Sequence, residues 1–171
     1  MKITTVSDNF VKSIEYFECS GDVTHYLKPY LDKCNIPTIG LGSTRYENGT
    51  KVSMTDPSIT KDRAYSLFRN KIHQFELDVD TYCPDDINQS QFDACVDFCY
   101  NAGSGGFHTS TLLKLIQSGE RNLEKLEPWF IAWDKGMVDG KLVELLGLKR
   151  RRKYEALLFC TGQINYFPDF K

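Results

Sequence analysis

The stretch TIGLGSTRYENGTKVSM, residues 38–54, interrupts a chain whose other apolar patterns have helical spacing. It begins with a short apolar run, residues 38–42, and continues to Asn48-Gly49, a dipeptide typical of tight hairpin turns. This pattern predicts a small β segment. The segments on either side of it decide the fold class.

On the N-terminal side, apolar residues recur at helical spacing: Phe10, Val11, Ile14 and Phe17. Ser7 or Asp8 can cap this helix, and Ser20-Gly21 stops the pattern, so a first helix is predicted to end near Glu18.

On the C-terminal side, Thr60 can cap a long helix that ends before Cys83-Pro84 and joins two lobes. Its predicted core face comprises Ala64, Leu67, Phe68, Phe75 and Val79, and its solvent face Lys61, Asp62, Arg69 and Lys71. Asn88 can cap a further segment, QSQFDACVDFCYNAG, which is apolar around most of its circumference and is predicted to be a central buried helix.

The remaining elements are also helical. Residues 103–106, GSGG, are predicted as a loop that breaks the central helix, Thr109 or Ser110 as the next cap, and residues from about Leu142 to Phe159 as a final helix. We therefore predict one mainly helical α+β domain over residues 1–171. A small β-hairpin lobe at about 20–59 would be joined by a long helix at 60–82 to a larger helical lobe at 83–171.

Composition and charge exclude several classes of function. The formal net charge of −2 gives no overall positive field to attract nucleic acid. The basic run at residues 149–153 is predicted as the solvated face of an amphipathic helix, with a nucleic-acid patch as the alternative. No apolar run approaches the roughly 18 residues of a membrane span, and the N-terminus has no apolar core of a signal peptide.

The cysteines do not form a metal-binding pattern. The six cysteines stand at positions 19, 34, 83, 95, 99 and 160. No two of them form a CxxC pair, and none has a histidine at the spacing of a zinc site, so no zinc site is expected. Cys95 and Cys99 fall in the apolar helical segment and are predicted to be buried free thiols.

Two carboxylates and a hydroxyl near the β segment could carry chemistry. Glycoside hydrolysis needs one protonated carboxylic acid and a second carboxylate that acts on water or on the sugar. Glu18 lies at a predicted helix C-terminus, where the helix dipole disfavours the ionised form, and Asp32 and Thr38 precede and open the β segment. The hydroxyl of Thr38 could hold a water beside Asp32. These residue types alone also fit solvated structural roles.

The order of the motifs adds a resemblance. Phe17-Glu18 followed by LKPYLDKCNIPTIGLGST resembles the signature of the phage lysozymes of glycoside hydrolase family 24. The block NQSQFDACVDFCYNAGSGGFHTSTLLKLIQSG is similar to the helical lobe of that family, and GLKRRRKYEALLF is similar to its C-terminal helix. The resemblance covers most of the chain and implies a lysozyme-like fold.

It also implies roles for individual residues. Glu18 would be the general acid, Asp32 would activate water or stabilise the reacting carbon, and Thr38 would position the water. Arg151 would pair with the catalytic glutamate, and Asn101 would support the acid or bind substrate.

The implied activity is hydrolysis of the β-1,4 bond between N-acetylmuramic acid and N-acetylglucosamine in peptidoglycan, by a monomer without metal or cofactor. Synthesis would end in the host cytoplasm, and a holin-type partner would release the enzyme to the wall.

The chain departs from the family pattern at three points. Thirteen residues stand between Glu18 and Asp32, more than is usual, which leaves Glu15 and Asp22 as rival acids. Cys19 replaces the usual glycine, and Ser43 replaces a frequent histidine that forms an ion pair. A lytic transglycosylase that uses Glu18 alone and a catalytically silent module that binds the wall or serves the virion remain alternatives.

Overall fold

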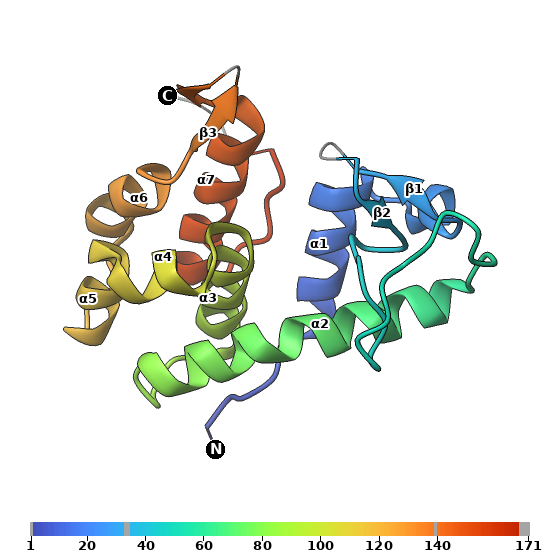
Figure 1. Ribbon diagram of the computed structural model, residues 1–171. Coiled ribbons are helices and arrows are strands. Elements are labelled where there is room, and N and C mark those ends of the chain that lie inside the picture. Colours follow the sequence, from blue (N-terminus) through green and yellow to red (C-terminus); the bar gives the residue numbers. More distant parts are fainter. Residues whose placement is uncertain (1, 33–34, 139, 168–171) are drawn as a thin grey trace. The chain divides into compact units, whose positions relative to one another are not determined.

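The computed structural model describes residues 2–32, 35–138 and 140–167 of the 171-residue chain, and Cys34 lies outside these ranges. The chain divides into two compact units (Figure 1). Residues 8–74 form the N-terminal unit, and residues 1–7 together with 75–171 form the C-terminal unit. The boundary between them falls within one long helix.

The N-terminal unit begins with helix α1, Asp8–Cys19, which ends where the first helix was predicted to end. A 3-10 turn, Val23–Tyr26, follows, and strands β1, Tyr30–Leu31, and β2, Pro37–Thr38, pair antiparallel. Two stacked rings, Phe10 and Phe68, join α1 to the long helix. A second cluster of buried side chains lies under the β segment: Ile39, Val52 and Leu67.

The predicted hairpin turn is present. Arg45 and Lys51 form an antiparallel bridge around Asn48-Gly49, and Gly49 adopts a φ of +82°. The Asn48 side chain accepts a hydrogen bond from the Thr50 N–H at 3.0 Å. Asparagine and glycine suit this turn because glycine takes a positive φ without strain and asparagine can bond the backbone two residues on.

Helix α2, Lys61–Tyr82, is the predicted long helix. The Thr60 hydroxyl accepts a hydrogen bond from the Arg63 N–H at 3.1 Å, as a helix cap should. Ala64, Leu67, Phe68 and Val79 are buried along it. Lys71 was predicted on the solvent face, and that prediction is wrong: the residue is half-buried.

The C-terminal unit is built from the last part of α2 and the helices that follow it. Asn88 and Gln91 form a reciprocal capping box at the start of α3, which confirms the predicted cap. The other helices are α3, Gln89–Ala102; α4, Ser104–Thr109; α5, Thr111–Gln117; α6, Leu123–Ile131; and α7, Leu146–Thr161. Helix α7 packs against α3 and α6 (Figure 1).

Aromatic rings fill the centre of this unit. The ring of Phe98 on α3 contacts three others, from Phe107, Phe130 and Trp133, with centroid distances of 5.6 to 6.2 Å. Such tilted and edge-to-face contacts add to the stabilisation that comes from burying the rings. Cys95 and Cys99 are buried free thiols on the same helix, as predicted.

Two predicted element boundaries in this unit are wrong. Residues 104–106 are not a loop, because α4 begins at Ser104; the break after α3 is confined to Gly103, whose φ is +84°. The final helix begins at Leu146 rather than near Leu142, because residues before it form an unpredicted hairpin of β3, Lys135–Val138, and β4, Lys141–Glu144.

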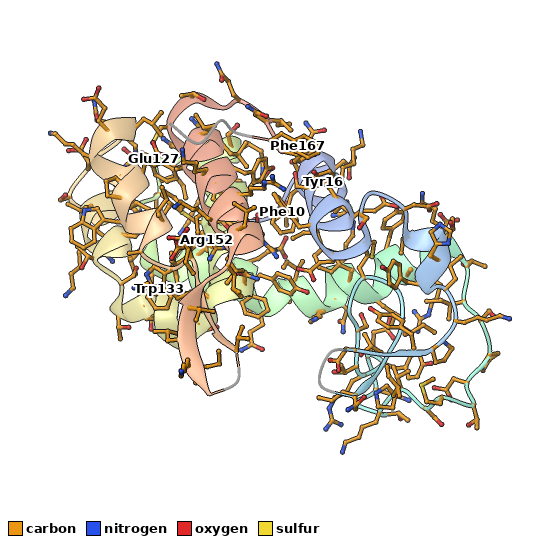
Figure 2. The ribbon with its side chains drawn as sticks, turned by 90° about the horizontal axis from the view of Figure 1, so that it is seen from above. Phe10, Tyr16, Glu127, Trp133, Arg152 and Phe167 are labelled. Atoms are coloured by element: carbon orange, nitrogen blue, oxygen red, sulfur yellow. The ribbon has the colours of Figure 1, made fainter. Side chains whose placement is uncertain are left out.

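The basic run at residues 149–153 is not a uniformly solvated face, and that prediction is also wrong. Arg151 and Arg152 are buried in the C-terminal unit, where Figure 2 labels Arg152. Arg151 donates to Asp97 at 2.6 Å, and Arg152 donates to Glu155 and lies 4.9 Å from the Phe98 ring centre. The burial of both arginines is possible because two carboxylates are buried with them.

We predict that Glu155 makes stability depend on pH. Burial raises the pKa of Glu155 to about 8, and Asp97 adds to the rise while Arg152 and Arg151 oppose it. The folded chain therefore holds a proton at pH values where the unfolded chain, with a carboxyl pKa near 4.5, has lost it. The contribution of this group to stability is full below pH 4.5 and is lost as pH rises through about 8.

The variant Glu155→Gln cannot ionise, so its free energy of unfolding should decline less than that of the unaltered chain across this range. Urea unfolding at a series of pH values measures the difference, with exposed Glu124→Gln as the control. Parallel pH profiles for the unaltered chain and Glu155→Gln would contradict the prediction.

Candidate active site

Glu18 lies in the last turn of α1 and is exposed. The chain leaves this helix through Ser20 and Gly21, which adopt φ values of +53° and +85°. The Gly21 N–H donates to the Glu15 carbonyl at 3.1 Å and closes the end of the helix. This sharp exit leaves the Glu18 side chain at the surface of the unit, available to a ligand.

Asp32 and Thr38 are both bonded to the backbone of Ile36. The Asp32 carboxylate accepts the Ile36 N–H at 2.9 Å, and the Thr38 hydroxyl donates to the Ile36 carbonyl oxygen at 2.9 Å. A backbone bond from the Asp32 N–H to the Ile36 carbonyl, at 3.1 Å, closes the same loop. One residue therefore fixes both side chains, although six positions separate them in the sequence.

These bonds determine what each group can still do. The Thr38 hydroxyl uses its hydrogen to donate to the Ile36 carbonyl, so its oxygen can still accept hydrogen bonds through its lone pairs. Asp32 is half-buried, and its carboxylate has further acceptor capacity. A water that donates one hydrogen to each oxygen would have its own lone pair free for attack.

Tyr30 is a neighbour of Thr38 in the small sheet. It stands opposite Thr38 in the β1–β2 ladder, and its ring contacts Tyr26 edge to face at a centroid distance of 5.0 Å. Burial raises the pKa of Tyr30 above its usual range, with smaller contributions from Cys19, Tyr26, Glu18 and Asp32. Tyr30 belongs to the quoted motif, but its residue type gave no sign of this position.

Lys71 is a second residue that the sequence did not identify. Its ammonium group donates to the Gly42 carbonyl oxygen at 2.8 Å. Its position, four residues after Leu67 and three after Phe68, is on the buried face of α2 by helical spacing. The spacing could have identified it, but its charge suggested the solvent face instead.

The two rival acids have structural partners. The Glu15 carboxylate is buried and accepts hydrogen bonds from the Val23 N–H at 3.0 Å and the Tyr65 hydroxyl at 2.8 Å, with Lys61 at 3.4 Å. The Asp22 carboxylate caps the 3-10 turn, where it accepts from the N–H and the hydroxyl of Thr24. Both therefore hold the segment between α1 and β1 in place.

Comparisons with known proteins identify the family of this chain. The family model described as Phage lysozyme matches residues 24–155. The chain belongs to the phage lysozyme family. It is 34% identical over 133 residues to an endolysin of Acyrthosiphon pisum secondary endosymbiont phage 1, which covers 78% of this chain and 86% of that protein.

Another relative is longer than this chain. The endolysin of Bacillus phage B103 is 39% identical over 105 residues, but the match spans 61% of this chain and 38% of that protein. Among solved structures, the endolysin from Escherichia coli O157:H7 phage FAHEc1 matches with a TM-score of 0.83 and 29% identity, covering 96% of this chain and 97% of that chain. Family membership and the mainly helical lysozyme-like fold are thereby confirmed, as is the predicted class of enzyme, a lysozyme-type hydrolase.

Arg151 and Asn101, to which the resemblance assigned roles, lie in the C-terminal unit. Arg151 bonds Asp97 through its Nε at 3.0 Å and its Nη2 at 2.6 Å, and its Nε is 3.8 Å from Glu155. Asn101 is exposed near the end of α3. Their predicted roles toward the acid and the substrate stay predictions.

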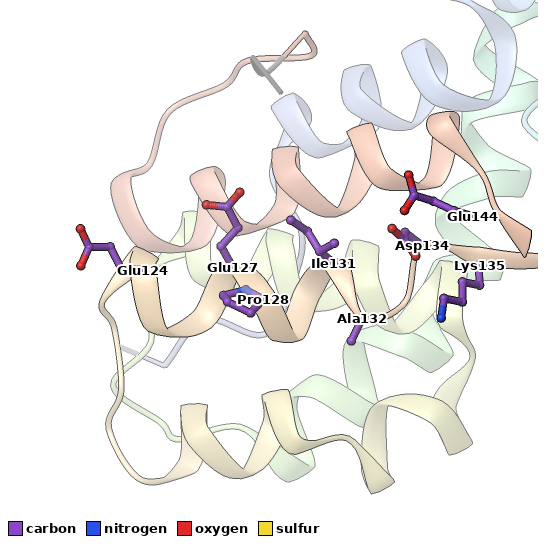
Figure 3. Close-up of a pocket in the computed structure, with 8 residues that line it drawn as sticks. All are labelled: Glu124, Glu127, Pro128, Ile131, Ala132, Asp134, Lys135 and Glu144. Carbon is purple, nitrogen blue, oxygen red and sulfur yellow. The ribbon is translucent and has the colours of Figure 1, made fainter. Parts of the chain in front are cut away.

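A pocket of about 510 Å³ lies elsewhere, in the C-terminal unit, and contains none of the predicted site residues (Figure 3). Four of its side chains are acidic, but Glu144 binds Lys149 at 2.9 Å and Glu127 lies 3.6 Å from Lys153. This pocket therefore gives no support to the predicted site residues.

We predict that Glu15→Ala destabilises the N-terminal unit. Removing the carboxylate leaves the buried Val23 N–H without its acceptor, at a cost of about 1–3 kcal/mol in the free energy of unfolding. Chemical unfolding measures the loss, and Glu124→Ala, at an exposed position, serves as the control with little expected change. Equal stability of both variants would contradict the structural role of Glu15.

Proposed function

We propose that this chain is an endolysin that hydrolyses the β-1,4 bond between N-acetylmuramic acid and N-acetylglucosamine in peptidoglycan. The observation that carries the proposal is the attachment of Asp32 and Thr38 to the backbone of the same residue, Ile36. An acid, a base and a water-holding hydroxyl thus belong to one compact unit. Membership of the phage lysozyme family supports the choice of substrate.

Each of the three groups has a part in the reaction. Protonated Glu18 donates its proton to the glycosidic oxygen as the bond to the leaving sugar breaks. Asp32 accepts a proton from the attacking water, whose second hydrogen is held by the Thr38 oxygen. The water attacks the anomeric carbon from the face opposite the leaving group, so the configuration inverts. No step requires a metal or a cofactor.

Two residues of the C-terminal unit have proposed roles as well. Arg151 and Asn101, on α7 and α3, would support the acid or bind the glycan. The family match runs from residue 24 to residue 155 and so draws on both units, which supports their action as one domain.

We further propose that the enzyme acts as a monomer, is made in the host cytoplasm and reaches the wall with the help of a holin-type partner.

Among the described residues, no helix is both long and apolar enough to cross a membrane. In the same ranges, no group of three or more His, Cys, Asp or Glu side chains could hold a metal ion.

The alternatives differ in what they require of Asp32 and Thr38. A lytic transglycosylase would need Glu18 alone and would leave anhydro-sugar ends, whereas hydrolysis leaves reducing ends. A silent module that binds the wall would release neither. The shared attachment of Asp32 and Thr38 to Ile36 favours hydrolysis, because only a water nucleophile uses that pair.

We predict that Glu18→Gln abolishes release of reducing sugar from purified peptidoglycan, with a loss of at least about a hundredfold. The side chain is exposed, so the variant should unfold at the same temperature as the unaltered chain. Asp22→Asn is the matched control: asparagine caps as well as aspartate does, and activity should persist. Activity in Glu18→Gln, or its loss in Asp22→Asn, would contradict the assignment of the acid.

We also predict that Thr38→Val lowers the turnover number by roughly a hundredfold while the chain remains folded, because valine fills the same space but cannot hold the water. Mass spectrometry of the digested wall identifies the products. Anhydro-sugar ends, or unchanged turnover in Thr38→Val, would favour the transglycosylase.

A further inference from the structure

Lys71 connects the catalytic end of the N-terminal unit to helix α2. Its side chain is half-buried and its ammonium donates to the Gly42 carbonyl oxygen at 2.8 Å. Gly42 belongs to the turn at residues 39–43 that directly follows Thr38. A long side chain from the buried face of a helix thus reaches the segment that carries the water-holding hydroxyl.

The turn at residues 39–43 is tightly fixed at its other points. Ile39 and Ser43 exchange two backbone hydrogen bonds, at 2.9 and 3.0 Å, and the Gly40 N–H donates to the Tyr26 carbonyl at 2.7 Å. A side chain on Gly40 would lie 2.9 Å from the Ala64 Cβ on α2, so the turn can approach the helix only with glycine there. The hydrogen bond from Lys71 adds a further anchor at Gly42, near the end of the turn.

We propose that Lys71 is a positioning residue for the hydrolysis: it anchors the turn that directly follows Thr38. This inference rests on the proposed function. The anchor limits movement of Thr38 relative to Asp32, and so keeps the attacking water aligned.

Substitutions distinguish this positioning role of Lys71 from a purely structural role. Lys71→Met removes both the hydrogen bond and the charge but keeps the aliphatic stem, whereas Lys71→Arg keeps both a donor and a positive charge. Lys12→Met, on the exposed face of the helix that carries Glu18, is the matched control. If Lys71→Met does not fold, Lys71→Gln provides the same loss of charge with a polar side chain.

Turnover of soluble peptidoglycan fragments is measured for each variant as kcat and KM across pH, together with the melting temperature. We expect Lys71→Met to lower kcat about tenfold with little change in KM, because a misaligned water slows the chemical step. Lys71→Arg should restore much of the lost kcat, and Lys12→Met should match the unaltered chain.

Unchanged kcat in Lys71→Met would overturn the inference while leaving the proposed function intact. A lower melting temperature with unchanged kinetics would assign Lys71 to stability alone. If the unaltered chain releases no reducing sugar, the proposed function fails, and this role of Lys71 fails with it.

Discussion

The candidate active site depends on the backbone of Ile36, held between a carboxylate that accepts its N–H and a hydroxyl that donates to its carbonyl. The antiparallel pairing of β1 and β2 brings Tyr30 opposite Thr38, and the loop between the strands returns Ile36 to Asp32. Because both side chains bond to the same residue, their separation is set locally. A very small sheet is therefore sufficient to build a precise pair of groups.

The two units are stabilised by different physical means. In the N-terminal unit, charged and polar side chains such as Glu15 and Lys71 hold irregular segments against α1 and α2. In the C-terminal unit, the aromatic rings around Phe98 supply apolar burial, and a buried group of two arginines and two carboxylates lies beside them. Burying these charges is costly even when they are paired, so the group contributes less to stability than its short contacts suggest.

The sequence predicted much of the fold because several of its signals are local. The end of α1, the cap at Thr60, the capping box of Asn88 and Gln91 and the turn at Asn48-Gly49 each depend on a few neighbouring residues. The hairpin of β3 and β4 was missed because its residues are largely exposed and alternate too weakly between apolar and polar. The start of α7 was misplaced for the same reason.

Residues that depend on tertiary partners were harder to predict. Arg152 shares the buried face of α7 with Glu155 and Phe159 by helical spacing, but its charge suggested a solvated position. Lys71 was misjudged in the same way. For the candidate site, the resemblance to phage lysozymes selected Glu18, Asp32 and Thr38, whereas the shared bonds to Ile36 and the position of Tyr30 required coordinates.

The central claim is that a water held by Asp32 and Thr38 attacks the sugar directly. Proton NMR of the first product formed from a soluble peptidoglycan fragment tests it most directly, because the anomeric signal reports the configuration at the broken bond before it equilibrates. The account predicts that the new reducing end appears first as the α-anomer, inverted from the β-linked substrate. Initial release of the β-anomer would contradict direct attack by that water.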